Sequence, residues 1–441
     1  MELIERGTLF VILLASLLIV AAMTRHAAIG LDLTDEGFYL NWIVAPHAYP
    51  HSVTQFGFVF HPLYVLLDGN LVRLRQLNLL LTYGVAWWCV WVAWDAALRA
   101  PVDWLPRASV SAALALPALL VLAGYTATPS YNTLDLQGLL LAFAGAIMAG
   151  RGNNPRSLCG WFLLTLGTWL VFIAKPPSAL FEGVVILAFV VATRRASIGK
   201  LAACIALGVV FAGTTGMLID GSLAQFFQRL YRGYTNTQLL QAGHDPRSLI
   251  RWDWLYLGKQ LDAALLVLFA TGSGFGYVSR RVDARTRILV ATLSVLACVY
   301  AALIMGWWWT PDWPIGIQKP RLPFLLAFPA GFVIAAAWPS PARRRPSREV
   351  LLMASTAMAL MYCFAVGSNN NYVIQMIRAG CFGVLGIAML LAPRVDAESC
   401  ARTTMMMCAG ILAVSGTLFY GTAHDPKRQL QPLHQQSASL Q

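Results

Sequence analysis

Apolar stretches dominate this sequence. They recur from the first residues to beyond residue 400, and most have about 17 to 25 residues, enough for an α-helix to cross a bilayer core of roughly 30 Å. Hydrophobic residues make up 58% of the chain and charged residues only 12%, whereas soluble domains carry roughly 25% charged residues. The stretches also lack the alternating pattern of a transmembrane β-barrel. We therefore predict an all-α polytopic membrane protein.

About thirteen helical spans are predicted along the chain. Their ranges are 8–24, 76–98, 109–126, 135–150, 159–174, 178–193, 201–218, 260–279, 288–306, 322–338, 350–366, 377–392 and 403–420. They form one transmembrane domain over residues 1–420, with long outer loops at 25–75 and 219–259. The first span is longer than a usual signal-peptide core, so we expect an uncleaved anchor. The polar tail 421–441 is too short to fold alone and is predicted to be disordered.

The net charge of +12 comes from Lys and Arg residues, most of which lie in the loops between the apolar spans. Lys and Arg of the short loops gather on one side of the predicted spans, as at Arg99, Arg151, Arg194 and Arg394. The positive-inside rule makes this side cytoplasmic. Topology and lipid contact account for the charge, so no nucleic acid partner is expected. The eight cysteines lie in or beside apolar spans, and neither a disulfide nor a structural zinc site is predicted.

Polar and aromatic residues are concentrated on the outer side. The outer segments are 25–75, 128–135, 174–179, 219–259, 306–321 and 367–378. The cytoplasmic loops are short and basic and contain no glycine-rich phosphate loop, so no nucleotide is expected there. Any chemistry is therefore expected on the outer side of the membrane.

The first outer loop carries adjacent carboxylates. Asp35 and Glu36 precede GFYLNWIVA, an apolar and aromatic segment that ends at Pro46, and a second short segment, HPLYVLL, follows. Both segments have the pattern of helices that lie in the membrane interface. Asp35 can simply cap the first of these helices. It can also accept a proton from a substrate hydroxyl.

This arrangement resembles the GT-C superfamily of membrane glycosyltransferases. The resemblance rests on a first span, an outer loop that opens with an Asp-Glu pair, two short interfacial helices and a second span with arginines at its outer end. More narrowly, it is similar to bacterial members that use polyprenyl-phosphate sugars, a group that includes aminoarabinose transferases and protein mannosyltransferases. The multi-span architecture covers most of the chain, but the motif is confined to residues 32–75.

The resemblance implies a sugar transferase of the bacterial inner membrane. It would move a sugar from a polyprenyl-phosphate donor to a glycan, lipid or protein acceptor on the periplasmic side, among membrane lipids and with its N-terminus in the cytoplasm. Asp35 matches the family's general base, with Asp32 as a second candidate, and Glu36 would orient it or help to hold a divalent cation. His61 stands where a Lys-Pro-type motif is expected, which makes it a candidate ligand of phosphate, acceptor or metal. An imidazole bonded to the backbone is the alternative for His61.

Cations are needed opposite the departing lipid phosphate. The candidates are Lys175, where two prolines break a span, Arg378 at the mouth of a span, and Lys319 and Arg321 after a tryptophan-rich loop. Each could instead reach outward as an anchor in the interface. Arg75 is predicted to anchor lipid headgroups or to pair with Asp68. No redox or nucleotide cofactor is required, and a divalent cation is the only candidate cofactor.

Neutral polar residues on the same side suit a sugar. Tyr131 and Asn132 are the candidates, although turn formation explains them nearly as well. The loop 219–259 is predicted to begin with an interfacial amphipathic helix and to continue as a lid. Its Arg229 and Arg232 would contact lipid headgroups or the donor phosphate.

Two other functions compete with the transferase. A transporter or flippase for a lipid-linked saccharide is expected to carry ionisable groups within its spans. The predicted spans carry few, and Glu182 is the main exception. A non-catalytic membrane scaffold is the other alternative, and it would fit a chain in which Asp35 is dispensable.

Overall fold

The computed structural model describes helices over most of residues 2–237 and over three shorter stretches after them. The described residues are 2–30, 35–98, 103–122, 127–237, 259–279, 346–368 and 372–391, with single residues at 331, 335, 408 and 411. All regular secondary structure in these residues is helical. The predicted all-α class is therefore confirmed for the described part of the chain.

Six of the described helices are long and apolar enough to cross a membrane. They are α1 (Glu2–His26), α4 (Leu71–Ala97), α5 (Trp104–Ala115) continued by the 3₁₀ helix η2 (Leu116–Leu122), α7 (Pro155–Ala174), α9 (Ile198–Asp220) and α14 (Arg348–Ala365). The other described elements are α2 (Asp35–Val44), η1 (Pro46–Ala48), α3 (Phe56–Leu66), α6 (Tyr131–Met148), α8 (Pro176–Ala192), α10 (Leu223–Thr237), α11 (Lys259–Ser279), α15 (Tyr372–Arg378) and α16 (Gly380–Leu391).

The predicted number of spans is only partly tested by this structure. Three of the thirteen predicted spans, 288–306, 322–338 and 403–420, lie almost wholly outside the described residues. The other ten coincide with described helices, but only six of these helices meet both the length and the hydropathy expected of a span. The structure is thus that of a helical protein suited to a membrane, and thirteen spans stay a prediction. The tail 421–441 also lies outside the described residues.

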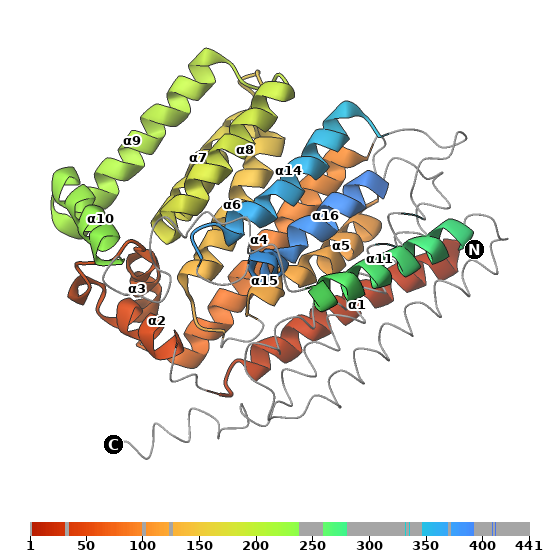
Figure 1. Cartoon of the computed structure of the whole chain (residues 1–441), viewed down its shortest axis with the longest axis horizontal. Helices are drawn as coiled ribbons and strands as arrows, with labels where there is room; N and C mark the ends of the chain where they lie inside the picture. Colours follow the sequence, from red (N-terminus) through yellow and green to blue (C-terminus); the bar gives the residue numbers. More distant parts are fainter. Residues whose placement is uncertain are drawn as a thin grey trace.

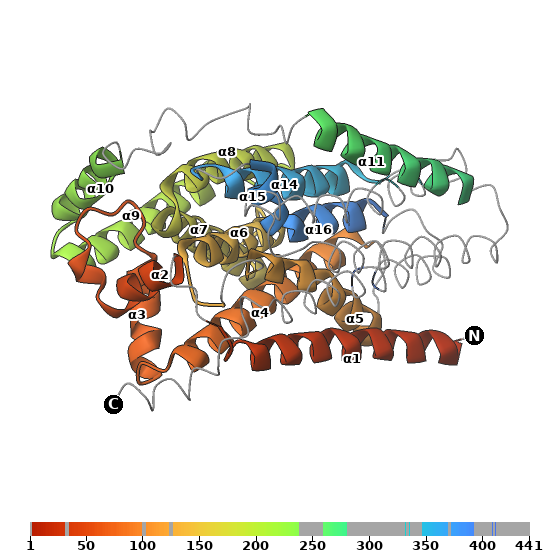
Figure 2. The ribbon, with the colours of Figure 1, turned by 60° about the horizontal axis from the view of Figure 1, so that its bottom comes forward.

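Helix α6 lies at the centre of the described bundle (Figure 1), where α4, α7, α8 and α14 contact it. Glycines let α6 and α7 approach backbone to backbone. A Cβ added at Gly145 would lie 2.4 Å from the Leu164 nitrogen, and one added at Gly167 would lie 2.4 Å from the Ala142 nitrogen. Small residues at such contacts are typical of helix packing in membranes. Helix α1 runs along one edge of the bundle, beside α5 and α4 (Figure 2).

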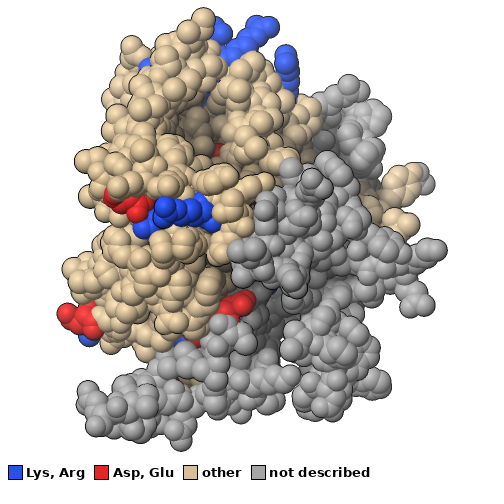
Figure 3. All heavy atoms as spheres, turned by 60° about the vertical axis from the view of Figure 1, so that its left-hand side comes forward, with Lys and Arg blue, Asp and Glu red and all other residues tan. Residues whose placement is uncertain are grey.

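Basic side chains make contacts at one end of the bundle. Arg107 forms an ion pair with Asp95 at 2.8 Å, Lys200 donates to Asn153 at 2.6 Å, and Arg195 pairs with Glu349. These residues belong to the loops that the sequence assigns to the basic side. In the space-filling view, Lys and Arg also gather at the upper edge, while much of the described surface below carries no charge (Figure 3).

The loops predicted to lie on the outer side meet at the opposite end. The backbone nitrogen of Gln55 donates to the Ile173 carbonyl oxygen at 2.8 Å, and the Asn78 side chain donates to the Ala127 carbonyl oxygen at 2.9 Å. Among the described residues, the alternation of loops between two ends therefore agrees with the sequence. The two short helices expected in the first outer loop are also present, as α2 and α3.

Candidate functional site

A buried ion pair fixes the start of α2. The Arg75 Nε donates to Glu36 Oε1 at 2.9 Å, and each side chain is only 1% exposed. The Thr128 hydroxyl also donates to this carboxylate, and Arg75 Nη1 donates to the Ala27 carbonyl oxygen at 3.1 Å. Glu36 thus joins the first outer segment to α4 and to the segment before α6. The predicted role of Arg75 as a headgroup anchor or a partner of Asp68 is wrong, because its guanidinium is buried against Glu36.

Asp35 lies beside this pair but faces outward. It is the first residue of α2 and is exposed, whereas Glu36 is buried. Successive residues of an α-helix point about 100° apart, which allows two adjacent carboxylates to face different environments. The helix start and the accessible carboxylate are compatible with both a cap and a general base. Asp32 lies outside the described residues.

His61 connects the two short helices. Its Nδ1 lies 2.8 Å from the Ile43 carbonyl oxygen, and a carbonyl oxygen only accepts, so Nδ1 carries the proton. This is the backbone-bonded arrangement. A role of His61 toward phosphate, acceptor or metal stays a prediction. Among the described residues no group of three or more His, Cys, Asp or Glu side chains is arranged to hold a metal ion.

Lys175 is already paired inside the bundle. It lies between α7 and α8, is 5% exposed, and its Nζ is 3.1 Å from Asp135 Oδ2. The same Nζ donates to the Phe364 carbonyl oxygen at 2.6 Å and lies 4.7 Å from the centroid of the Phe364 ring. A donor phosphate would have to compete with Asp135 for this ammonium.

Asp135 is a residue that the sequence analysis missed. It is fully buried in α6, and its Oδ1 accepts from the Ser178 hydroxyl at 2.9 Å. The sequence contained an indication of this pair, because a carboxylate in one apolar helix and a lysine at the end of another apolar helix are expected to pair. What the sequence lacked was the packing that brings α6 against the junction of α7 and α8.

The remaining predicted site residues are spread over several elements. Arg378, in α15, is 8% exposed and lies 3.4 Å from Gln375 Oε1. Tyr131 begins α6, with its ring edge-on to Tyr39 at 5.8 Å. Asn132 is buried, and its Oδ1 has no hydrogen-bond partner in the described part of the chain. Lys319 and Arg321 lie outside the described residues.

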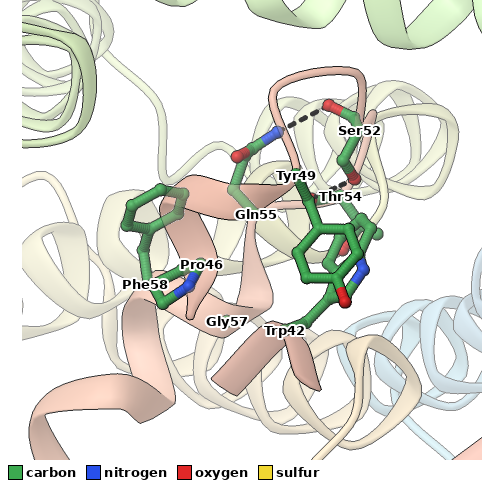
Figure 4. Close-up of a pocket in the computed structure, with 8 residues that line it drawn as sticks. All are labelled: Trp42, Pro46, Tyr49, Ser52, Thr54, Gln55, Gly57 and Phe58. Carbon is green, nitrogen blue, oxygen red and sulfur yellow. Dashed lines mark hydrogen bonds between the residues drawn. The ribbon is translucent and has the colours of Figure 1, made fainter. Parts of the chain in front are cut away.

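The first outer segment also encloses a small hollow (Figure 4). It is lined by Trp42, Pro46, Tyr49, Ser52, Thr54, Gln55, Gly57 and Phe58. Two hydrogen bonds close it, from Gln55 Nε2 to the Ser52 carbonyl oxygen at 2.6 Å and from Ser52 Oγ to the Thr54 carbonyl oxygen at 2.7 Å. It leaves no room for a water molecule. None of Asp35, His61 and Lys175 lines this hollow.

Helix α10 docks on the same segment through Arg229. The Nε of Arg229 lies 3.0 and 2.9 Å from the two carboxylate oxygens of Asp220, and its Nη1 donates to the Tyr49 carbonyl oxygen at 3.1 Å. The guanidinium lies 5.5 Å from the centroid of the Phe58 ring. Arg229 is therefore an internal tie and not the predicted contact to headgroups or donor phosphate, whereas Arg232 is exposed.

Comparisons with protein-family models, with curated proteins and with solved structures gave no match to this chain.

Proposed function

We propose that the chain is a GT-C-type glycosyltransferase of the bacterial inner membrane, with its active site on the periplasmic side. The observation that supports this most is that two adjacent carboxylates differ in their exposure. Glu36 is buried and neutralised by Arg75, and Asp35 stands exposed at the start of the same helix. A rigidly held helix that presents one accessible carboxylate suits a general base.

The proposed reaction is a single displacement at the anomeric carbon. Asp35 takes the proton of an acceptor hydroxyl while that oxygen bonds to the anomeric carbon. The bond from this carbon to the donor phosphate breaks, and its electron pair leaves with the polyprenyl phosphate. Glu36 positions Asp35 through the Arg75 pair. Cations stabilise the departing phosphate, and the candidates stay Lys175, Arg378, Lys319 and Arg321.

The position of Asp35 relative to the bundle fits a lipid-linked donor. Asp35 begins a segment that is packed at the end of the bundle opposite the basic contacts. We place the basic end in the cytoplasm by the positive-inside rule, so Asp35 is placed on the periplasmic side. Aromatic side chains surround the start of this segment, with Tyr39 edge-on to both Phe56 and Tyr131. We expect a polyprenyl-phosphate sugar to approach along this end, and a glycan, lipid or protein acceptor to approach from the periplasm.

The test is transfer of a labelled sugar from polyprenyl-phosphate donors by the purified full chain. Asp35→Asn should reduce turnover by at least about 10²-fold, the size expected from loss of a general base. Asp68→Asn is the matched control, because Asp68 is another exposed aspartate of the same outer segment. Asparagine also tolerates its positive φ of 53°. Equal turnover of the Asp35→Asn variant and the wild type would refute the general-base role.

A transporter for a lipid-linked saccharide is the second candidate, and one observation favours it. Asp135, Lys175 and Glu182 form a buried group of charged residues in the bundle, as expected of a substrate or ion pathway. Vesicles that contain the chain and a labelled lipid-linked saccharide distinguish the two functions. Movement of the label between leaflets without chemical change supports the transporter, and a new glycosidic product supports the transferase.

A further inference from the structure

Three ionisable side chains lie together inside the described bundle. Asp135 and Glu182 are fully buried, at 0% exposure, and Lys175 is 5% exposed. They come from α6, the junction of α7 and α8, and α8. Ionisable groups in the interior of a membrane protein are expensive and commonly mark a pathway or binding site for ions.

The two carboxylates differ in their partners. Asp135 Oδ1 accepts from the Ser178 hydroxyl, and Asp135 Oδ2, which accepts no hydrogen bond from the described residues, is paired with Lys175 Nζ at 3.1 Å. Glu182 Oε1 accepts from the Thr168 hydroxyl at 2.9 Å. Glu182 Oε2 has no hydrogen-bond partner among the described residues. Of the buried carboxylate oxygens of this group, Glu182 Oε2 therefore has neither a hydrogen bond nor an ion pair with the described residues.

Helix geometry places Glu182 next to the ion pair. Ser178 and Glu182 are four residues apart on α8, so their side chains share one face of the helix. The Ser178 hydroxyl donates to the Asp135 carboxylate of α6. The Glu182 side chain therefore lies about one turn of α8 away from the place where Asp135 meets this helix. Cys363 of α14 is a further titratable side chain within electrostatic range of both carboxylates, and a thiol supplies no positive charge.

The charges of the group do not balance. One lysine ammonium faces two carboxylates, which leaves a net charge of −1 if both are ionised. An isolated charge in an apolar interior costs so much free energy that it is normally paired or neutralised. Lys175 is already held by Asp135 and by the Phe364 carbonyl oxygen near the C-terminus of α14. Glu182 therefore needs a positive charge of its own.

We propose that this group is a binding site for one monovalent cation, a proton or Na⁺, held at Glu182. The ligand atoms are the Glu182 carboxylate and the Thr168 hydroxyl, both oxygens, which suit a hard cation. Helices α7 and α8 are joined at Lys175 by a connection with prolines at the start of α8, and this connection holds the ammonium close to Asp135. A single positive charge completes the balance, whereas a divalent ion would exceed it.

The test uses the full chain in lipid nanodiscs and needs no sugar transfer, so its failure and failure of the transferase proposal are distinguishable. Infrared spectra report the carbonyl stretch of a protonated carboxylic acid, and melting curves in NaCl and in KCl report specific binding of Na⁺. If the ligand is a proton, the infrared band is present at neutral pH and is lost in Glu182→Gln. If it is Na⁺, NaCl raises Tm more than KCl does, and Glu182→Gln loses this difference.

Glu349→Gln is the control, because Glu349 is half-exposed at the other end of the bundle and should leave both signals unchanged. Thr168→Val keeps the carboxyl group and removes only its hydroxyl donor. It should shift the band or weaken the Na⁺ effect, and it carries the test if Glu182→Gln does not fold. The proposal is overturned if the wild type shows neither signal, or if Glu182→Gln and Thr168→Val keep the wild-type signal unchanged.

Discussion

Arg75 and Glu36 form an ion pair that is almost completely shielded from solvent, with Nε and Oε1 2.9 Å apart. The two residues are 39 positions apart in the chain. The pair lies where the segment after α1 returns to the bundle, and it ties the beginning of α2 to the beginning of α4. Everything proposed for Asp35 depends on this tie, because it decides which of the two adjacent carboxylates is accessible.

Arg75→Met should destabilise the protein strongly. It leaves the Glu36 carboxylate buried without its cation, and breaking a buried ion pair in this way costs about 3–5 kcal/mol. The double variant Glu36→Gln/Arg75→Met should regain part of this loss, since no uncompensated charge remains. Denaturant unfolding in mixed micelles of the wild type, Arg75→Met, Glu36→Gln and the double variant gives four free energies of unfolding, and the double-mutant cycle built from them gives the coupling between the two side chains.

Arg73→Met is the matched control for this experiment. Arg73 is two residues before Arg75 on the same helix but is exposed, so its replacement should change the free energy of unfolding by no more than about 0.5 kcal/mol. If Arg75→Met cost no more than Arg73→Met, the ion pair would not hold the first outer segment.

The contact between α6 and α7 gives a second prediction. Gly145→Ala places a Cβ 2.4 Å from the Leu164 nitrogen, a separation that only a shift of the two helices can relieve. Overpacking of this kind costs about 1–3 kcal/mol. Gly183→Ala is the control, since no atom lies within 4 Å of its added Cβ, and it should leave stability unchanged or raise it by up to about 1 kcal/mol. The melting temperature should therefore fall for Gly145→Ala and stay the same or rise for Gly183→Ala.

For the described residues, the sequence was sufficient to predict that the chain is helical and where most of these helices lie. Long apolar runs specify helices because every backbone polar group must be satisfied within the segment. The two short helices of the first outer loop were also predicted, although α3 begins at Phe56, earlier than the predicted HPLYVLL segment. These features depend on local composition, which a single sequence contains.

Pairings between distant residues could not be predicted in the same way. Glu36 with Arg75 and Asp135 with Lys175 depend on which helices are neighbours and on their rotation. The sequence indicated that Arg75 and Lys175 lie near the outer end, but several anions were available to each. The glycines of α6 and α7 allow these two helices to approach closely, but a single sequence does not show which helix each of them faces.

A third prediction concerns how α10 is held. Arg229→Met removes the ties from α10 to Asp220 and to the Tyr49 carbonyl oxygen, so amide hydrogen exchange over residues 223–237 should become faster. Arg232→Met removes an exposed arginine of the same helix and should leave the exchange rates as they are. Equal protection in the two variants would show that the apolar contacts of α10 are sufficient for docking.

The exposed surface of α10 supports a further prediction about lipids. Four of its exposed apolar residues recur at spacings that place them on one side of the helix, and they are Leu223, Phe227, Tyr231 and Tyr234. Another side is buried against the protein, at Phe226, Arg229 and Gly233. Aromatic residues that combine an apolar ring with a polar tip are enriched at the level of the lipid headgroups. We expect α10 to lie in the membrane interface, with the Phe227 side toward the acyl chains.

Site-specific photocrosslinking tests this orientation. Benzoylphenylalanine at position 227 should form lipid adducts in membranes, whereas the same group at Gln228 should form few, because neighbouring residues point about 100° apart. Both native residues are exposed, with Phe227 at 51%, so a crosslinking side chain at either position can reach the surroundings of the protein. Equal lipid adducts at the two positions would mean that the whole exposed surface of α10 is in lipid. Adducts to protein only would mean that the aromatic side is covered by another part of the chain or by a second copy of it.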